Sequence, residues 1–165
     1  MTDKKTILIT GANRGIGLAL VKESLSKNLF VIACSRNDNN NQSLNSLKCK
    51  NLLLFKVDVT DEFSINKMGK AINKNIDFLV CNAGINNGYG SFDSEDHSKE
   101  KMLDVFNVNV IGPILTVRNV MHRINKGSNI IFISSIMGVQ KHEGSRATIY
   151  RASKAALNNV MISMS

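Results

Sequence analysis

The chain has 165 residues, of which 43% are apolar and 21% charged, and its formal net charge is +8. This length predicts one domain, residues 1–165, with a core of its own. The sequence has no apolar run that could cross a bilayer and no signal-peptide pattern at its start, so we expect a cytoplasmic protein without a membrane partner. The lysines are scattered and form no basic helix, which argues against nucleic acid as a partner.

The cysteines are Cys34, Cys49 and Cys81, an odd number at wide spacing. We expect all of them to be reduced thiols. Because no Cys or His pair has the spacing of metal ligands, no metal site is predicted.

A glycine-rich turn joins an apolar strand pattern at 6–10 to a helical pattern at 15–27, and it reads Thr10-Gly11-Ala12-Asn13-Arg14-Gly15-Ile16-Gly17. Such a turn exposes backbone N–H groups, and the helix N-terminus adds about half a positive charge, so the pattern predicts a phosphate site. Gly11 permits the tight turn, Gly15 lets phosphates approach the backbone, and Gly17 lets the helix pack on the strand. The alternative is an ordinary strand-to-helix turn that contains three glycines.

Later apolar runs predict parallel strands at 30–35, 51–57, 76–81 and 129–134. Between them lie a polar stretch at 37–50 with about one helical turn, a helix at 61–73 and a long helix at 99–125. This alternation predicts an α/β fold, a doubly wound parallel sheet of about five strands in a three-layer αβα arrangement.

The long helix carries apolar residues at steps of three and four, which predict one buried stripe, and these are Leu103, Phe106, Val110, Ile114, Val117 and Met121. Pro113, the only proline, predicts a kink or a break in that helix.

The end of the second strand bears on the choice of dinucleotide. An acidic residue there would bind a ribose 2′-hydroxyl and favour NAD, but the sequence reads Ser35-Arg36-Asn37. Arg36, with Arg14 in the glycine turn, suits a 2′-phosphate, so NADP(H) is favoured over NAD(H). The alternatives are that both arginines are merely solvated and that nearby Asp38 reaches the ribose.

Tyr150 and Lys154 are four residues apart, so on a helix they share one face. A lysine ammonium near a phenol stabilises the phenolate and lowers its pKa, which lets such a pair exchange a proton with an alcohol or carbonyl oxygen. Ser134 and Ser135 come just before, at the end of the last strand. Because neighbouring strand residues face opposite sides, only one of them can point into the cleft.

Four patterns occur in order along essentially the whole chain: Thr-Gly-x-x-x-Gly-Ile-Gly, Asn82-Ala83-Gly84, Ser134-Ser135 and Tyr150-x-x-x-Lys154. Together they resemble the short-chain dehydrogenase/reductase family, and the stretches around the glycine turn and Tyr150 look most like its C-factor branch. The resemblance implies a Rossmann fold and an NADP-dependent oxidoreductase that transfers hydride between nicotinamide and a small carbonyl or alcohol substrate.

The resemblance also implies site roles. Tyr150 would be the general acid or base, and Lys154 would assist it and hold the nicotinamide ribose. Ser135 would orient the carbonyl, and Asn109 would shape the site and hold a water of a proton relay. The residues expected to bind the cofactor are Gly11, Asn13, Arg14, Gly15, Ile16, Gly17, Arg36, Asp58, Val59, Asn82, Ala83, Gly84, Tyr150 and Lys154.

Asp58, Asn109 and His97 also have interpretations without a role in binding or catalysis. In the family, an Asp at the place that Asp58 occupies here accepts a hydrogen bond from the adenine amine. Alternatively, Asp58 or Thr60 caps the following helix. Asn109 could be only a helix-bend residue that bonds backbone. His97 in the loop at 85–98, which contains Gly88 and Gly90 and is expected to border the substrate entrance, is more typical of a solvated residue than of a base.

The sequence ends at Ser165, inside the helix that carries Tyr150, whereas the family continues into a sixth strand, a substrate-covering helix and usually a seventh strand. We therefore expect a C-terminally incomplete member of the family. The alternative function is a nucleotide-binding module without turnover. Because the family often pairs the helices that carry Asn109 and Tyr150 across a four-helix interface, a homodimer or homotetramer is expected.

Overall fold

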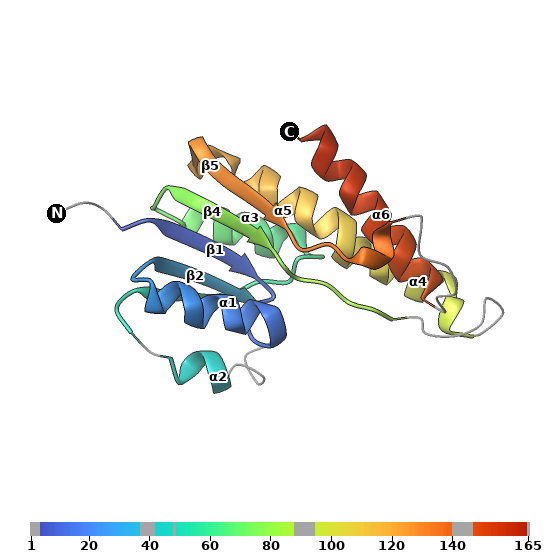
Figure 1. Ribbon diagram of the computed structural model, residues 1–165, viewed down its shortest axis with the longest axis horizontal. Helices are drawn as coiled ribbons and strands as arrows, with labels where there is room; N and C mark the ends of the chain where they lie inside the picture. The colour runs from blue at the N-terminus through green and yellow to red at the C-terminus, as the bar shows by residue number, and fades with distance from the viewer. Residues whose placement is uncertain (1–3, 37–41, 48, 88–94, 140–146, 165) are drawn as a thin grey trace.

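The computed structural model describes residues 4–36, 42–47, 49–87, 95–139 and 147–164. In this part of the chain, five parallel strands form one sheet in the order β3-β2-β1-β4-β5 (Figure 1). The strands are β1 (Thr6–Thr10), β2 (Phe30–Ser35), β3 (Leu52–Lys56), β4 (Ile76–Cys81) and β5 (Ile124–Phe132). The chain starts at β1, winds outward to β3 and returns to β4 on the other side of β1. This confirms the predicted doubly wound, Rossmann-type sheet.

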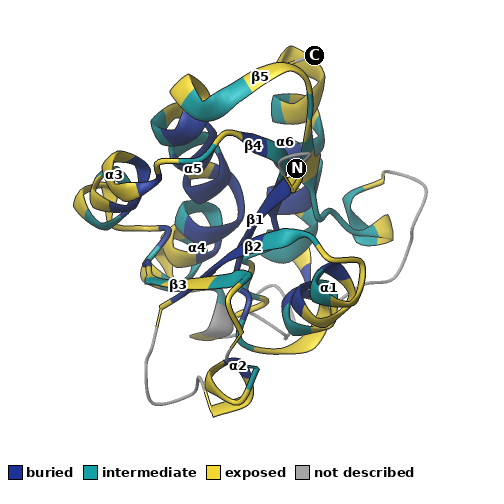
Figure 2. Ribbon diagram, turned by 90° about the vertical axis from the view of Figure 1, so that its left-hand side faces the viewer, coloured by how far each residue is buried: buried dark blue, intermediate teal, exposed yellow. Residues whose placement is uncertain are grey.

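Helices cover both faces of the sheet (Figures 1 and 2). One face is covered by α1 (Gly15–Ser26), with the short α2 (Gln42–Asn45) below it. The other face carries α3 (Glu62–Ala71), α4 (Lys99–Phe106) and α5 (Gly112–Val120), and α6 (Thr148–Ser163) packs against α4. The three layers are those expected from the sequence. Within the described residues, no helix is both long and apolar enough to cross a membrane.

The central strand β1 separates two apolar cores. Leu8 points into the core shared with α3 and α5, whereas Ile7 and Ile9 point into the core shared with α1. This is the alternation expected of a strand with both faces covered, and every residue of β1 is buried. A site at the carboxyl end of β1 therefore follows a strand that is packed on both faces.

The chain is helical from Lys99 to Arg123, as predicted for 99–125, but this helical segment is not regular. The chain forms α4, a π-helical turn (Asn107–Ile111), α5 and a 3₁₀ turn (Met121–Arg123), and β5 then begins at Ile124. Pro113 lies in the first turn of α5. Its ring would clash with the carbonyl of Asn109 in a regular helix, and the wider π turn relieves that contact, so the predicted break is present.

The π turn also shifts the apolar stripe. Val110 and Val117 are buried as predicted, but Leu103 is 53% exposed and Met121 is 51% exposed. The extra residue in the π turn rotates the two ends of the helical segment relative to each other, so one stripe cannot stay buried along its whole length.

The last strand was predicted at 129–134, but β5 begins five residues earlier and ends at Phe132. Its polar start, with Gly127 at φ +92, pairs irregularly with β4 near Ile76. Ser134 and Ser135 therefore lie beyond the strand, and strand alternation does not decide where they point.

Candidate functional site

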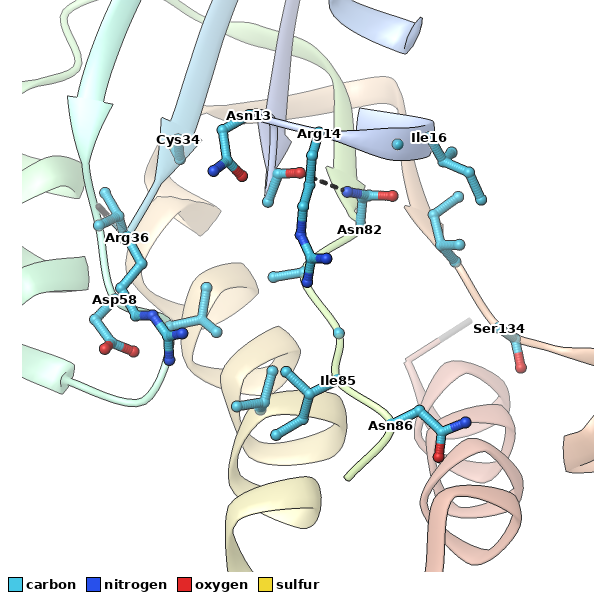
Figure 3. Close-up of a pocket in the computed structure, with 18 of the residues that line it drawn as sticks. Asn13, Arg14, Ile16, Cys34, Arg36, Asp58, Asn82, Ile85, Asn86 and Ser134 are labelled. Atoms are coloured by element: carbon cyan, nitrogen blue, oxygen red, sulfur yellow. Dashed lines mark hydrogen bonds between the residues drawn. The ribbon is translucent and has the colours of Figure 1, made fainter. Parts of the chain in front are cut away.

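The carboxyl ends of β1, β2 and β4 open into a cavity of about 640 Å³. Figure 3 shows Arg36 and Asp58 at one end, Ser134 and Asn86 at the other, and Arg14 between them. The lining residues are Gly11, Asn13, Arg14, Gly15, Ile16, Cys34, Arg36, Val57, Asp58, Val59, Asn82, Ala83, Gly84, Ile85, Asn86, Val108, Ile133, Ser134, Tyr150 and Lys154. The predicted cofactor residues thus come together in one cavity, apart from Gly17, which is buried beneath the turn.

The three glycines of the turn have distinct environments. Gly11 has φ +63, and a Cβ there would lie 2.8 Å from Ala83 Cα. At Gly17 a Cβ would lie 2.3 Å from the Gly11 carbonyl oxygen, whereas at Gly15, with φ +52, it would meet nothing within 4 Å. Gly11 therefore allows both the turn and the approach to β4, Gly17 allows helix α1 to pack on the turn, and Gly15 leaves open space above the backbone.

Hydrogen bonds from Asn82 and Thr10 fix the turn to the end of β4. The Asn82 amide Nδ2 donates to the carbonyl of Thr10 at 2.9 Å. It also donates to the carbonyl of Gly11 at 3.0 Å (Figure 3). In return, the Thr10 hydroxyl accepts from the backbone N–H groups of Asn82 at 3.0 Å and Ala83 at 3.1 Å. Sequence reasoning assigned Asn82 to the cofactor and missed this reciprocal bonding, which a polar residue between small ones at a strand end could have indicated.

The N-terminus of α1 opens into the cavity and suits a phosphate. Its N-cap residue is Arg14, whose side chain makes no capping hydrogen bond within the described part of the chain. The first N–H groups of α1 thus remain available for an anion at the positive end of the helix dipole, beside the open space over Gly15. The cavity therefore fits the diphosphate of a dinucleotide.

At the far end of the cavity, Arg36 is exposed and Asp58 is half-buried. The Asp58 carboxylate accepts hydrogen bonds from Thr60, from its N–H at 2.9 Å and from its hydroxyl at 2.7 Å. The residue that caps α3 is Asp61, which accepts from the Phe63 N–H at 3.0 Å, so the interpretation of Asp58 or Thr60 as the cap is wrong. Asp38, the alternative ribose ligand, lies outside the described residues.

Lys154 and Tyr150 lie in the first two turns of α6 and line the opposite end of the cavity. The Lys154 ammonium donates to the carbonyl of Ile133 at 2.8 Å and lies 5.7 Å from the centroid of the Tyr150 ring. Lys154 is only 4% exposed, and this burial lowers its pKa. A Cβ on Gly84 would lie 3.6 Å from Lys154 Nζ, so the small residue predicted at the end of β4 leaves room for the lysine.

Ser134 and Ser135 make different contacts. Ser134 lines the cavity, and its hydroxyl donates to Asn158 Oδ1 at 2.6 Å. The hydroxyl of Ser135 accepts from the Met137 N–H at 3.2 Å and caps the 3₁₀ turn Ile136–Gly138. Ser135 is not among the cavity-lining residues of the described chain, so its role as the carbonyl-binding hydroxyl stays a prediction.

Gly138 holds that turn against α6. A Cβ at this position would lie 2.8 Å from the carbonyl carbon of Lys154 and 3.1 Å from the backbone nitrogen of Ala155. Sequence reasoning did not single out Gly138 or Asn158. In the sequence they appear only as a glycine three residues after Ser135 and an amide one turn after Lys154. Both patterns occur too often by chance to indicate a role before the fold is known.

Asn109 lies in the π turn and is fully buried. Its Oδ1 accepts from the Ile85 N–H at 2.9 Å, and its Nδ2 donates to the Ile85 carbonyl at 2.9 Å and to the Ser153 hydroxyl at 3.0 Å. These contacts match the interpretation of Asn109 as a residue that bonds backbone at a helix bend. They also place it beside the site, because a Cβ on Gly84 would lie 3.3 Å from Asn109 Oδ1.

Other candidates lie apart from the cavity. His97 is in the 3₁₀ turn Glu95–His97 and does not line the described cavity, while Gly88 and Gly90 of the same loop lie outside the described residues. Among the described residues, no three His, Cys, Asp or Glu side chains gather as a metal site would require. Cys34 and Cys81 are buried free thiols, and Cys49 is an exposed one.

Comparisons with known proteins agree with this arrangement. The chain is 38% identical over 146 residues to the uncharacterized oxidoreductase YusZ of Bacillus subtilis, covering 83% of this chain and 51% of that protein. It is 34% identical over 155 residues to carbonyl reductase family member 4 of Danio rerio, covering 91% of this chain and 63% of that protein. The chain thus spans about half to two thirds of the length of these relatives.

Among solved structures, a carbonyl reductase from Pseudomonas aeruginosa in complex with NADP is similar with a TM-score of 0.88 and 30% identity, covering 97% of this chain and 74% of that one. The sequence model of the short chain dehydrogenase family matches residues 5–165. With the glycine turn, Asn82-Ala83-Gly84 and Tyr150-x-x-x-Lys154 in one cavity, the chain belongs to the short-chain dehydrogenase/reductase family.

Proposed function

We propose that this protein is an NADP-dependent oxidoreductase that interconverts a small carbonyl compound and its alcohol. One observation carries the proposal: Tyr150 and Lys154 line the same cavity as the glycine turn and the open N-terminus of α1. When bound there, the nicotinamide cofactor supplies hydride chemistry. The chain supplies the binding groups, the orientation and the proton.

The acid–base group of this proposal is Tyr150. Its phenol would give a proton to the carbonyl oxygen in reduction and take it back in oxidation. The Lys154 ammonium, held by the Ile133 carbonyl at 2.8 Å, would stabilise negative charge on the phenolate oxygen and bind ribose hydroxyls. Ser135 would orient the substrate oxygen, and Asn109 would keep the end of β4 in place through Ile85.

The preference for NADP is supported by two arginines. Arg14 and Arg36 both line the cavity, and both are exposed, so their guanidinium groups are available to an added phosphate. We expect Arg36→Ala to weaken binding of NADPH about 10- to 100-fold and binding of NADH less than twofold, because a charged hydrogen bond is lost only with the phosphate. Titration followed by the fluorescence of the cofactor measures this directly, since the chain has no Trp.

A second candidate function is binding of the dinucleotide without turnover. It is favoured by the exposure of Gly84 and Asn86 at the reacting end of the cavity, which leaves that end open to water. Turnover of NADPH with a panel of aldehydes and ketones distinguishes the two. Turnover that Tyr150→Phe abolishes supports the oxidoreductase, whereas binding with equally inert wild type and variant supports the binding module.

We also propose a homodimer or homotetramer that pairs the helices carrying Asn109 and Tyr150. Leu103 is 53% exposed and Ile111 is 44% exposed along the first of these helical segments, and such apolar side chains suit a subunit contact. Light scattering at working concentration tests this, and a monomer would count against it.

A further inference from the structure

Ser153 lies between Tyr150 and Lys154 in α6 and is fully buried. Its hydroxyl accepts a hydrogen bond from Asn109 Nδ2 at 3.0 Å and donates one to the carbonyl of Tyr150 at 2.7 Å. Asn109 in turn holds both the N–H and the carbonyl of Ile85. One line of hydrogen bonds therefore runs from the end of β4, through the π turn, to the first turn of α6.

A serine that bonds the carbonyl three residues before it is common in helices and by itself implies nothing more than a local bend. Ser153 differs because its oxygen also accepts from a side chain of another element. Asn109 uses its one oxygen and both hydrogens of its amide in the three bonds described, and both residues are fully buried. Without the serine oxygen, one amide N–H of Asn109 loses its partner where water cannot replace it.

These hydrogen bonds connect residues on the two sides of the reacting end of the cavity. Ile85 and Gly84 form one wall, and Tyr150 and Lys154 form the other. If the Asn109 amide turns, the backbone at Ile85 is released on one side and the Tyr150 turn on the other. A shift of about 1 Å between reacting groups is enough to slow a reaction by about 100-fold.

We propose that Ser153 is a positioning residue that fixes the Tyr150 turn of α6 relative to the end of β4 by orienting the Asn109 amide. The reaction it would serve is the one proposed above, so this part of the inference rests on the proposed function. The structural part does not, because the hydrogen bonds to Ile85 exist without substrate or cofactor.

The first test is therefore amide hydrogen exchange at the Ile85 N–H, measured by NMR on the protein without cofactor. In Ser153→Ala we expect this amide to exchange about five- to tenfold faster, because its acceptor on Asn109 is no longer held in one orientation. The matched control is Thr116→Val. Thr116 is also a buried helix residue, and its hydroxyl donates to the Gly112 carbonyl at 2.8 Å. In this control we expect Ile85 exchange to stay within twofold of wild type.

A double-mutant comparison then asks whether Ser153 acts through Asn109. In an Asn109→Ala background, Ser153→Ala is expected to change the exchange rate of the Ile85 amide less than twofold further. The Asn109 side chain, through which Ser153 would act on Ile85, is already absent in that background. Should Ser153→Ala fail to fold, Ser153→Cys keeps a side chain of similar size while replacing the hydroxyl by a weak acceptor. Unchanged Ile85 exchange in both foldable variants would overturn the proposal.

The second test separates positioning from a merely structural role. We expect Ser153→Ala to lower kcat about tenfold and to change the dissociation constant of NADPH less than twofold, whereas Thr116→Val changes neither. An equal loss of kcat in both variants would overturn the positioning role. If wild type itself turns over no carbonyl substrate, the proposed function fails, and the Ile85 exchange measurement still decides whether Ser153 orients Asn109.

Discussion

The central strand β1 and the edge strand β5 lead into the two ends of the site, and they are built very differently (Figure 2). All five residues of β1 are buried, and the strand pairs with β2 and β4. No residue of β5 is buried, and in the described chain it pairs with β4 alone. The end that suits a phosphate thus follows a fully buried central strand, whereas the end with Tyr150 and Lys154 follows an edge strand without a buried residue.

The difference extends to the kind of group that each end presents. At the β1 end, backbone N–H groups are available to bind an anion and glycines leave room for it. Asn82 and Thr10 fix this turn to the end of β4. At the β5 end, the proposed acid–base groups are the side chains of Tyr150 and Lys154. Their positions depend on α6 and on the turn that Gly138 packs against it. Substitutions near β1 should therefore lower both the free energy of unfolding and the affinity for the cofactor. Substitutions near β5 should mainly lower kcat.

The largest effect is expected for Gly17→Ala. The added Cβ would lie 2.3 Å from the Gly11 carbonyl oxygen and 3.0 Å from Ala12 Cα, and backbone cannot move aside cheaply. We expect a loss of about 3 kcal/mol in the free energy of unfolding, together with loss of NADPH binding. Urea unfolding and cofactor titration measure the two losses.

Gly15→Ala is the matched control for that variant. Nothing lies within 4 Å of the added Cβ, but Gly15 has φ +52, so the change costs only backbone strain of about 1 kcal/mol. Equal destabilisation by the two substitutions would mean that close packing beneath the turn is not what Gly17 provides.

At the other end, Gly138→Ala is expected to destabilise the protein by about 2 kcal/mol, because the added Cβ would lie 2.8 Å from the Lys154 carbonyl carbon. To relieve the contact, the turn Ile136–Gly138 has to move away from α6. We expect kcat to fall at least tenfold while the NADPH dissociation constant changes less than threefold. A variant with normal kcat would show that the packing of this turn does not position the reacting groups.

How far the sequence predicts this molecule follows the same division. The strands around β1 and the glycine turn have strong local patterns, and their predicted bounds agree with the structure to within about one residue. Around β5 the local patterns mislead. The polar stretch before Ile130 gives no strand signal, and the π turn at Asn109 arises from the contact between Pro113 and a carbonyl one turn earlier.

The candidate site divides in the same way. Glycines, Asn82-Ala83-Gly84 and the Tyr150–Lys154 spacing are visible in the sequence because the chemistry needs those residue types at fixed separations. The bonds that hold them are not visible. Ser153 meets Asn109, and Asn158 meets Ser134, across more than twenty residues of sequence, and these contacts exist only after the helix and the strand have packed.

The buried thiols of the central strands should make the free energy of unfolding depend on pH. Burial in the central strands raises the pKa of Cys34, and likewise of Cys81, to about 12 from an ordinary value of 9.0. The unfolded chain therefore loses these protons at lower pH than the folded chain, and stability falls as pH rises above 9. Each thiol is expected to contribute a loss of about 1.4 kcal/mol by pH 10.

Urea unfolding at pH 8 and pH 10 measures that loss, which should be about 1.4 kcal/mol smaller in Cys34→Ala and unchanged in Cys49→Ala, since Cys49 is exposed. Lys154 acts in the opposite direction. Its pKa is lowered by burial, so the folded chain binds fewer protons than the unfolded chain below pH 10.5, and stability rises with pH in that window. A pH dependence that Cys34→Ala leaves unchanged would mean that the central strands admit water.

The smallest expected effect tests the contrast between the two strands with one chemical change. Ile9 in β1 is fully buried, whereas Ile131 in β5 is 40% exposed. Removing one methyl group by Ile9→Val should cost about 1 kcal/mol, because the core on the α1 side cannot close around the gap. Ile131→Val should cost less than about 0.5 kcal/mol, because solvent already reaches that side chain and valine suits a strand equally well. Urea unfolding of the two variants under one condition gives both numbers. If the two costs are equal, a contact that shields Ile131 must form in solution, and light scattering of the same samples would then show whether a second copy of the chain supplies it.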